Sequence, residues 1–342
     1  MNNILITGGA GYIGSHVVKQ LLENTNHNVI IIDNLTDGVC DSITALLNIA
    51  EDKSRLTFYE EDLSNFIVIE NIFSTNNFDA VIHFAASIVV PESVTNPMKY
   101  YMNNTVNTTN LVNLCNKYNV NKFVFSSTAA VYGEPSALPI TEETPQKPIN
   151  PYGMSKLMSE HVIKDLSRAK EDFNYVIFRY FNVAGADVQT RIGECHEPET
   201  HLVPLIIHAA IGKREKIMMY GDDYNTPDGS CIRDYVHVDD LADAHIKALG
   251  YLKEHKKSNI FNCGYGDGFS VKEVVDIIKK VSGVDFTVEI APRRDGDPAE
   301  LVADNSKILQ EMNWKPKYQD LELICKSALK WEQKKMKDFN EQ

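Results

Sequence analysis

The chain has 342 residues, a length that favours two domains or one large domain with a cap. Hydrophobic residues make up 43% and charged residues 24% of it, which is a globular composition and excludes a disordered or fibrous chain. The formal net charge of −13 disfavours nucleic acid or an anionic membrane as a partner, so an anionic ligand must be held by a few well-placed cations.

The sequence also lacks the signals of export or membrane insertion. No apolar run approaches the length of a membrane span, and the first residues do not have the pattern of a secretory signal. The six cysteines are scattered and form no Cys-x-x-Cys pair. We therefore expect a cytoplasmic protein whose cysteines are reduced thiols.

The first half of the chain alternates short apolar runs with helical patterns. Helices are predicted at 12–23, 100–118 and 151–168, and strands at 4–7, 29–32, 56–59, 79–84, 122–125 and 175–180. The strands do not alternate apolar with polar residues, so both of their faces should be buried. This pattern predicts the α/β class, with a doubly wound parallel sheet of the Rossmann type.

The rhythm changes after residue 182. Further helices are predicted at 202–211, 238–252 and 271–281, and strands at 217–220, 259–263 and 286–290. We predict a first domain of residues 1–182, to which the chain returns at about 236–263. Residues 183–235 and 264–342 are predicted to form a smaller second domain.

A glycine-rich segment lies between the first predicted strand and helix. Gly8, Gly11 and Gly14 are the small residues that a tight turn and a close approach to a pyrophosphate require, and the helix N-terminus would face the phosphates. Asp33 ends the second strand, where a carboxylate can bind a ribose diol; a turn or cap residue is the alternative. No arginine in 33–38 could bind a 2′-phosphate, so NAD is favoured over NADP.

A second group of residues suggests acid–base chemistry. Tyr152 and Lys156 share one face of a predicted helix, where the ammonium would lower the pKa of the phenol. The alternative is a surface tyrosine beside a solvated lysine. Ser126, Ser127 and Thr128 end a buried strand, at the edge where ligands bind in such sheets. We expect Thr128 to contact the reacting oxygen and the two serines to cap the strand.

These segments together resemble a known family. The Gly-x-x-Gly-x-x-Gly spacing resembles the extended branch of the short-chain dehydrogenase/reductase superfamily, and the whole chain resembles the UDP-galactose 4-epimerases. The matching segments are 7–16 (TGGAGYIGSH), 33–35 (DNL), 83–86 (HFAA), 125–133 (FSSTAAVYG), 151–156 (PYGMSK), 179–182 (RYFN), 233–238 (RDYVHV) and 291–298 (APRRDGDP). The resemblance implies NAD in the first domain, a UDP-hexose in the second, C4 epimerisation between UDP-glucose and UDP-galactose through a 4-keto sugar, and a homodimer.

The resemblance also implies roles for individual residues. The implied catalytic residues are Thr128, Tyr152 and Lys156. Cofactor contacts are implied for Gly8, Gly11, Tyr12, Ile13, Gly14, Asp33, Asn34, Leu35, Thr36, Asp62, Leu63, Phe84, Ala85, Ala86, Asn103, Tyr152, Lys156 and Phe181. Contacts to the UDP-sugar are implied for Thr128, Tyr152, Asn182, His201, Leu202, Met218, Tyr220, Arg233, Arg294, Asp297 and Leu301.

The chain departs from the family pattern at two of the positions compared. Ile88 stands where one type of the family has a lysine, which removes an expected cofactor contact. His201 stands where another type has an asparagine. At Leu301 the family varies the residue that faces the sugar. We expect leucine to leave UDP-glucose and UDP-galactose as the main pair and to allow activity on the N-acetylated sugars.

Three other functions compete with this interpretation. A sugar-nucleotide 4,6-dehydratase or decarboxylase is disfavoured, because dehydratases of this type have Asp-Glu where this chain has Ala129 and Ala130. An NAD-sensing binding module would usually lack the Tyr152–Lys156 pair. A metal hydrolase is the third. We expect no metal site, because no familiar zinc spacing links the residues in question, which are Cys195, His196, His201 and His208.

Overall fold

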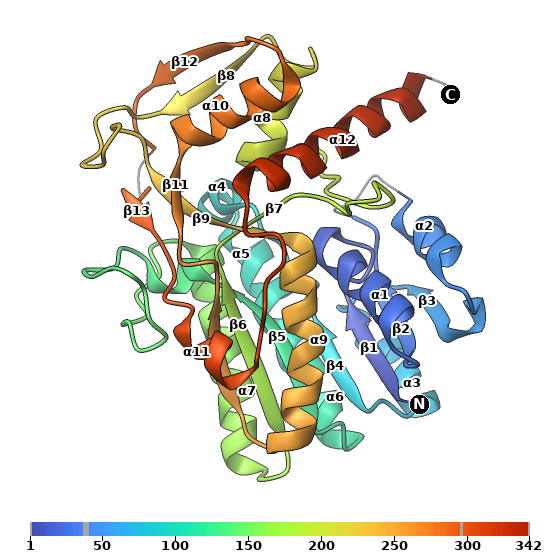
Figure 1. Ribbon diagram of the computed structural model, residues 1–342. Coiled ribbons are helices and arrows are strands. Elements are labelled where there is room, and N and C mark those ends of the chain that lie inside the picture. The colour runs from blue at the N-terminus through green and yellow to red at the C-terminus, as the bar shows by residue number, and fades with distance from the viewer. Residues whose placement is uncertain (1, 37–40, 295–296, 341–342) are drawn as a thin grey trace.

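A seven-stranded parallel sheet forms the centre of the computed structural model, which describes residues 2–36, 41–294 and 297–340 (Figure 1). The strand order is β10-β6-β5-β4-β1-β2-β3. The strands are β1 (Asn3–Thr7), β2 (Asn28–Asp33), β3 (Leu56–Glu60), β4 (Ala80–His83), β5 (Lys122–Thr128), β6 (Asn174–Tyr180) and β10 (Asn259–Cys263). The predicted doubly wound fold class is confirmed.

Both faces of this sheet are buried, as the unbroken apolar runs predicted. Successive side chains point to opposite faces: Ile4 and Ile6 of β1 join one core, and Leu5 joins the other. The first core is closed by α1 (Tyr12–Asn24), α2 (Ser42–Ile49) and α9 (Val238–His255). The second core is closed by α3 (Phe66–Thr75), α6 (Asn107–Lys117) and α7 (Pro151–Ala169).

The order of the strands determines where a ligand can bind. From β1 the chain builds outward through β2 to β3, and then crosses back to β4 on the other side of β1. At such a reversal the connections after two neighbouring strands diverge and leave a crevice at the carboxyl ends. The segments that follow β1, β2 and β4 therefore meet at one edge, and these are the segments with Gly8, Asp33 and Phe84.

The other elements lie mainly above this edge (Figure 1). A four-stranded sheet contains β7 (Asn182–Ala184), β9 (Ile232–His237), β11 (Gly268–Ser270) and β13 (Glu300–Leu301), and β8 (Lys216–Tyr220) pairs with β12 (Thr287–Ala291). Three helices accompany them: α8 (Leu202–Ala210), α10 (Val271–Ser282) and α12 (Leu321–Asn340). Between these parts the chain returns through α9 and β10 to the large sheet.

The helix predicted at 100–118 is not regular. It begins as α5 (Pro97–Tyr100), widens into the π-helix η2 (Tyr101–Val106) and only then continues as α6. In η2 the side chain of Asn104 accepts from the backbone N–H of Ser87 at 2.8 Å and donates to the Ser155 hydroxyl at 3.0 Å. The wider turn thus fixes the segment after β4 against α7, and such turns are frequent at functional sites.

The remaining elements are short helices: η1 (Lys53–Arg55), α4 (Val90–Thr95), which precedes α5, η3 (Ala129–Tyr132) and α11 (Ser306–Glu311). Over the described ranges of the chain, no helix combines the length and the apolar character needed to cross a bilayer.

The cysteines only partly follow the expectation of reduced thiols. Cys115, Cys231, Cys263 and Cys325 are free and buried, as small apolar side chains are. Cys195 is disulfide-bonded, so the expectation is wrong at that position.

Candidate active site

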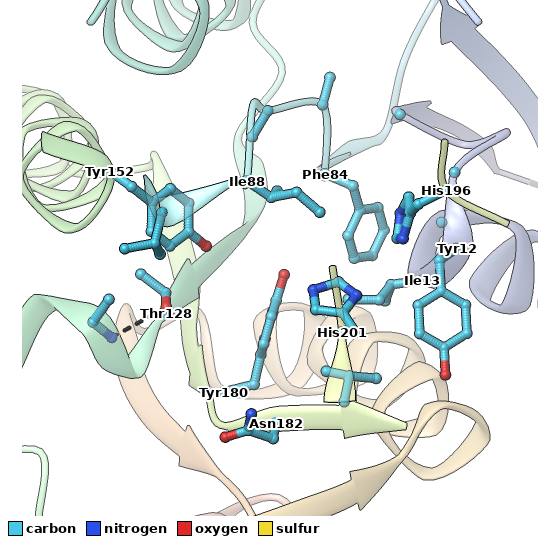
Figure 2. Close-up of a pocket in the computed structure, with 18 of the residues that line it drawn as sticks. Tyr12, Ile13, Phe84, Ile88, Thr128, Tyr152, Tyr180, Asn182, His196 and His201 are labelled. Carbon is cyan, nitrogen blue, oxygen red and sulfur yellow. Dashed lines mark hydrogen bonds between the residues drawn. The ribbon is translucent and has the colours of Figure 1, made fainter. Parts of the chain in front are cut away.

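A cavity of about 450 Å³ lies at the carboxyl edge of the large sheet, and Figure 2 shows side chains that line it. This volume is in the range of sites that take small molecules and cofactors. Nearly all the residues predicted to contact cofactor or substrate line it. The exceptions are Lys156, Met218, Tyr220 and Arg294.

The glycine loop leaves no room for side chains at two of its positions. Gly8 has a φ of 72°, and a Cβ there would lie 2.6 Å from the backbone nitrogen of Ala85. A Cβ on Gly14 would lie 2.1 Å from the carbonyl oxygen of Gly8. No side chain caps the start of α1 at Gly11. The loop therefore presents backbone N–H groups to the cavity, which is the arrangement that binds a pyrophosphate.

Two carboxylates shape the end of the cavity beyond the loop. Asp33 accepts from the backbone N–H groups of Ala10 and Leu35, each at 2.9 Å, so it links the end of β2 to the glycine loop. Asp62 accepts from the Asn34 side chain at 2.6 Å. These groups form the polar end at which an adenosine ribose was predicted.

Tyr152 and Thr128 face the cavity from neighbouring elements (Figure 2). Pro151 and Asn150 start α7 just before Tyr152, and the Asn150 side chain caps the helix by accepting from the Gly153 N–H at 2.8 Å. Burial raises the pKa of Tyr152, and the hydrogen bond with Thr128 acts in the opposite direction. The two side chains predicted to handle the reacting oxygen are therefore adjacent.

Lys156 does not line the cavity. Its ammonium donates to the carbonyl oxygen of Ser126 at 2.9 Å, behind the cavity wall, and burial lowers the pKa of Lys156 to about 7. Burial raises the pKa of Tyr152, so its lowering by Lys156 stays a prediction. Spacing on a helix could place the two side chains on one face, but could not predict the competing carbonyl acceptor on β5.

Tyr180 and Glu160, to which the sequence analysis gave no role, support the same wall. The hydroxyls of Tyr180 and Ser126 are hydrogen-bonded, and Tyr180 points into the cavity between Tyr152 and His201 (Figure 2). Ser127 donates to the buried Glu160 at 2.7 Å, and Arg179 pairs with the same carboxylate at 2.7 Å. The position of Tyr180 just before Phe181 was the only sequence signal for it.

The cavity is also lined by Arg233, one of the residues for which a contact to the UDP-sugar was implied. Arg233 is nearly buried and pairs with Asp297 at 3.1 Å. Arg294 also pairs with Asp297, at 3.0 Å, but is exposed and lies over the ring of Tyr220 outside the cavity wall. Met218 is on β8 nearby, and Asp295 and Gly296 of the same motif lie outside the described residues.

A cluster of histidines and glutamates completes the cavity. His201 and the buried Glu194 are hydrogen-bonded, His196 lies 3.2 Å from the same carboxylate, and Glu199 lies 3.8 Å from His201. Glu194 was missed, because a glutamate in a polar loop gives no sequence signal of burial. The four residues weighed as a metal site are not brought together, since His208 pairs with Glu332 at 2.9 Å.

Comparisons with known proteins agree with this geometry. Residues 4–264 match the NAD dependent epimerase/dehydratase family. The chain belongs to this family. A UDP-glucose 4-epimerase of Halalkalibacterium halodurans is 47% identical, with 96% of this chain and 95% of that protein covered. A probable UDP-arabinose 4-epimerase of Oryza sativa is 44% identical, over 98% of this chain and 80% of that protein. A solved UDP-Glc/GlcNAc 4-epimerase from Campylobacter jejuni is 54% identical, with a TM-score of 0.85 and coverage of 98% and 100%.

Proposed function

We propose that this family member interconverts UDP-glucose and UDP-galactose by inverting the C4 centre with a bound NAD. The observation that carries the proposal is that one cavity contains both the glycine loop with Asp33 and the pair Tyr152 and Thr128. The phenol of Tyr152 can act as an acid and base beside the dinucleotide site, which is the arrangement needed for hydride transfer at a carbon that bears a hydroxyl group.

The residues at the loop fit NAD. Gly8 and Gly14 leave space only for backbone, and a pyrophosphate would lie on the start of α1. Asp33 would hold the adenosine ribose through its hydroxyls, and its charge would repel a 2′-phosphate. When bound, NAD supplies the acceptor and donor for the hydride of C4.

The remaining steps belong to the side chains of this chain. Tyr152 would take the proton of the 4-hydroxyl, and Thr128 would hold that oxygen. Arg233 would anchor the diphosphate by two parallel hydrogen bonds, which leaves the 4-keto sugar free to turn and present its other face. Tyr152 would then return the proton, and no net oxidation occurs.

The chemistry around Thr128 supports epimerisation over dehydration. Ala129 and Ala130 follow it in η3 and line the cavity. Neither has an acid or base to remove water from the sugar. The test is to incubate the purified protein with UDP-galactose and to resolve the products: UDP-glucose is expected. Turnover of UDP-arabinose but not of UDP-galactose, or accumulation of a 4-keto-6-deoxy sugar, would contradict the proposal.

We also propose that the N-acetylated UDP-sugars are accepted. Leu301 lines the cavity three residues after Pro298, and leucine is shorter than an aromatic side chain. A merely apolar wall discriminates by only about 1–3 kcal/mol, so exclusion of an acetamido group requires a clash. The 54% identity with a UDP-Glc/GlcNAc 4-epimerase supports this extension.

Replacing Leu301 with tyrosine is expected to lower the relative activity on UDP-N-acetylglucosamine by about tenfold or more, and to spare UDP-glucose. The measurement is kcat/KM on both substrate pairs for wild type and Leu301→Tyr. If the ratio of the two values stays at the wild-type level, Leu301 does not limit the size of the sugar.

Replacing Asp33 with alanine is expected to weaken NAD and to reduce the preference for NAD over NADP. The substitution removes the acceptor for the ribose and the charge that repels a phosphate. It also removes the acceptor for the Ala10 N–H, so the melting temperature is measured alongside the two affinities. A wild-type protein that prefers NADP would contradict the role of Asp33 in excluding a 2′-phosphate.

We propose further that the protein is a homodimer. The helices α4, α5, η2 and α7 pack together. Each carries an exposed apolar side chain, namely Val94, Met98, Met102 and Met158. Apolar side chains gathered in this way suit a protein–protein contact.

The proposed domains are those predicted from the sequence, with NAD in residues 1–182 and the UDP-sugar held by 183–235 and 264–342.

A further inference from the structure

The cavity has few positive charges for the ligands proposed for it. NAD and a UDP-sugar each carry an anionic diphosphate. Among the described residues that line the cavity, Arg233 is the only arginine or lysine, and Asp297 already pairs with it. Ile88, at the position where a lysine was one expected cofactor contact, lines the cavity as well.

His201 is a second group that can hold a positive charge there. Its Nδ1 is hydrogen-bonded to the carboxylate of Glu194, and its side chain is 43% exposed, so the rest of the ring is open to the cavity. The Glu194 side chain is 4% exposed. A carboxylate buried to that degree needs a hydrogen-bonded counter-charge, and a protonated histidine provides it.

The segment that carries Glu194 is held in place from behind. Trp331 and Lys335 of α12 both donate to the Glu194 carbonyl oxygen, at 2.7 and 3.0 Å. A Cβ on Gly193 would lie 2.6 Å from the Trp331 ring, so the segment packs closely on α12. The carboxylate is therefore built into the fold and does not depend on a mobile side chain.

The surroundings of His201 favour its charged form. Burial lowers the pKa of His201, but the charge of Glu194 and its hydrogen bond outweigh burial and raise the pKa to about 9. The other titratable groups near the pair are His196 and Glu199 on the same segment, Tyr12 on α1 and Lys335 on α12. At neutral pH His201 is thus an imidazolium.

The imidazole lies close to the phosphate loop. The ring of His201 is 5.3 Å from that of His196, which in turn is 6.5 Å from the ring of Tyr12, the first residue of α1. Figure 2 shows the two histidines beside Tyr12, Ile13 and Phe84, at the start of α1. We infer that His201, held protonated by Glu194, is the cation that binds a ligand diphosphate at the N-terminus of α1.

This inference rests on the proposed function, because it assumes that NAD and a UDP-sugar occupy the cavity. His201 contacts His196, and His196 contacts Tyr12 at the start of α1, which favours the cofactor's diphosphate over that of the substrate. The experiment distinguishes the two diphosphates. The first arm measures how much NAD the purified protein retains during dialysis. The second measures binding of UDP and of uridine to the NAD-loaded protein by calorimetry.

The variants are His201→Gln, which removes the charge, and His208→Gln as the matched control. His208 is also a histidine paired with a buried glutamate, but it does not line the cavity. A charge-assisted hydrogen bond to a diphosphate corresponds to about tenfold or more in affinity. We expect His201→Gln to bind either NAD or UDP about tenfold more weakly than wild type does. Its binding of uridine should be unchanged, and His208→Gln should behave like wild type.

Weaker NAD retention assigns His201 to the cofactor, and weaker UDP binding assigns it to the substrate. Wild-type values in both arms would overturn the inference. So would a stoichiometric metal ion in the purified protein that His201→Gln loses, because the cluster would then hold a metal and not a proton. If the wild-type protein binds neither NAD nor UDP, the proposed function is wrong. That outcome is distinguishable from a failure of the His201 inference, in which wild type binds both ligands and His201→Gln binds them equally well.

A pH series distinguishes charge from mere structure. A histidine with a raised pKa stays protonated below that value and loses its charge as the pH rises through it. Ligand retention by wild type should therefore fall near pH 9, and Glu194→Gln should move this fall down toward the ordinary histidine pKa of about 6.5. Equal weakening at every pH, without a shift in midpoint, would show a structural role only.

Discussion

Tyr152→Phe is expected to lower the rate of epimerisation by about a thousandfold, while the protein folds and retains NAD. Phenylalanine keeps the buried ring in the cavity wall but removes the hydroxyl that exchanges the proton with C4-OH, and positioned acid–base groups contribute about 10²–10⁴ in rate. The measurement is kcat for UDP-galactose, with bound NAD and the melting temperature recorded for the same sample.

The matched control is Tyr118→Phe, which removes a phenol hydroxyl outside the cavity, next to Glu70. It should turn over like wild type. Turnover by Tyr152→Phe within a few-fold of wild type would remove Tyr152 from the mechanism. Loss of both activity and NAD would instead show that the hydroxyl supports the cavity and not the chemistry.

Gly14→Ala is expected to have the largest effect on stability and on NAD. Alanine favours a helix by about 1 kcal/mol over glycine, so propensity alone predicts stabilisation. The new methyl group, however, would lie 2.1 Å from the Gly8 carbonyl oxygen, and this neighbour is backbone that cannot rotate away. We expect the free energy of unfolding to fall by about 2–3 kcal/mol and NAD to be lost from the purified protein.

Gly250→Ala provides the control for the same substitution in α9. Nothing lies within 4 Å of a Cβ at that position. The melting temperature should therefore stay the same or rise, and NAD should be retained. If Gly14→Ala behaves like Gly250→Ala in both thermal melts and NAD content, the loop is not the tight phosphate site described.

The large sheet could be predicted because its signals are local. Branched runs such as 29–32 are buried on both faces, and only a parallel sheet covered by helices provides that environment. Helix α3 was not predicted, since its sequence FIVIENIF is rich in β-branched and aromatic residues that favour a strand. Packing of Ile69, Ile72 and Phe73 on the sheet overrides this preference.

The site was predictable where a motif fixes backbone geometry, as at Gly8, Gly14 and Asp33. It was less predictable where a side chain has a choice of partners. Lys156 could have faced the phenol of Tyr152, but the Ser126 carbonyl offers it an acceptor. The Glu194–His201 pair depends on α12, which lies more than a hundred residues further along the chain. No local pattern could bring these together.

In the proposed reaction, a hydride leaves C4 of the sugar and returns to the same carbon. The direct measurement is to run the reaction on UDP-galactose in deuterium oxide and to examine C4 of the UDP-glucose by NMR. Because a transferred hydride does not exchange with solvent, C4 of the product should carry protium. Deuterium at C4 would mean that the hydrogen left as a proton, and would contradict the account.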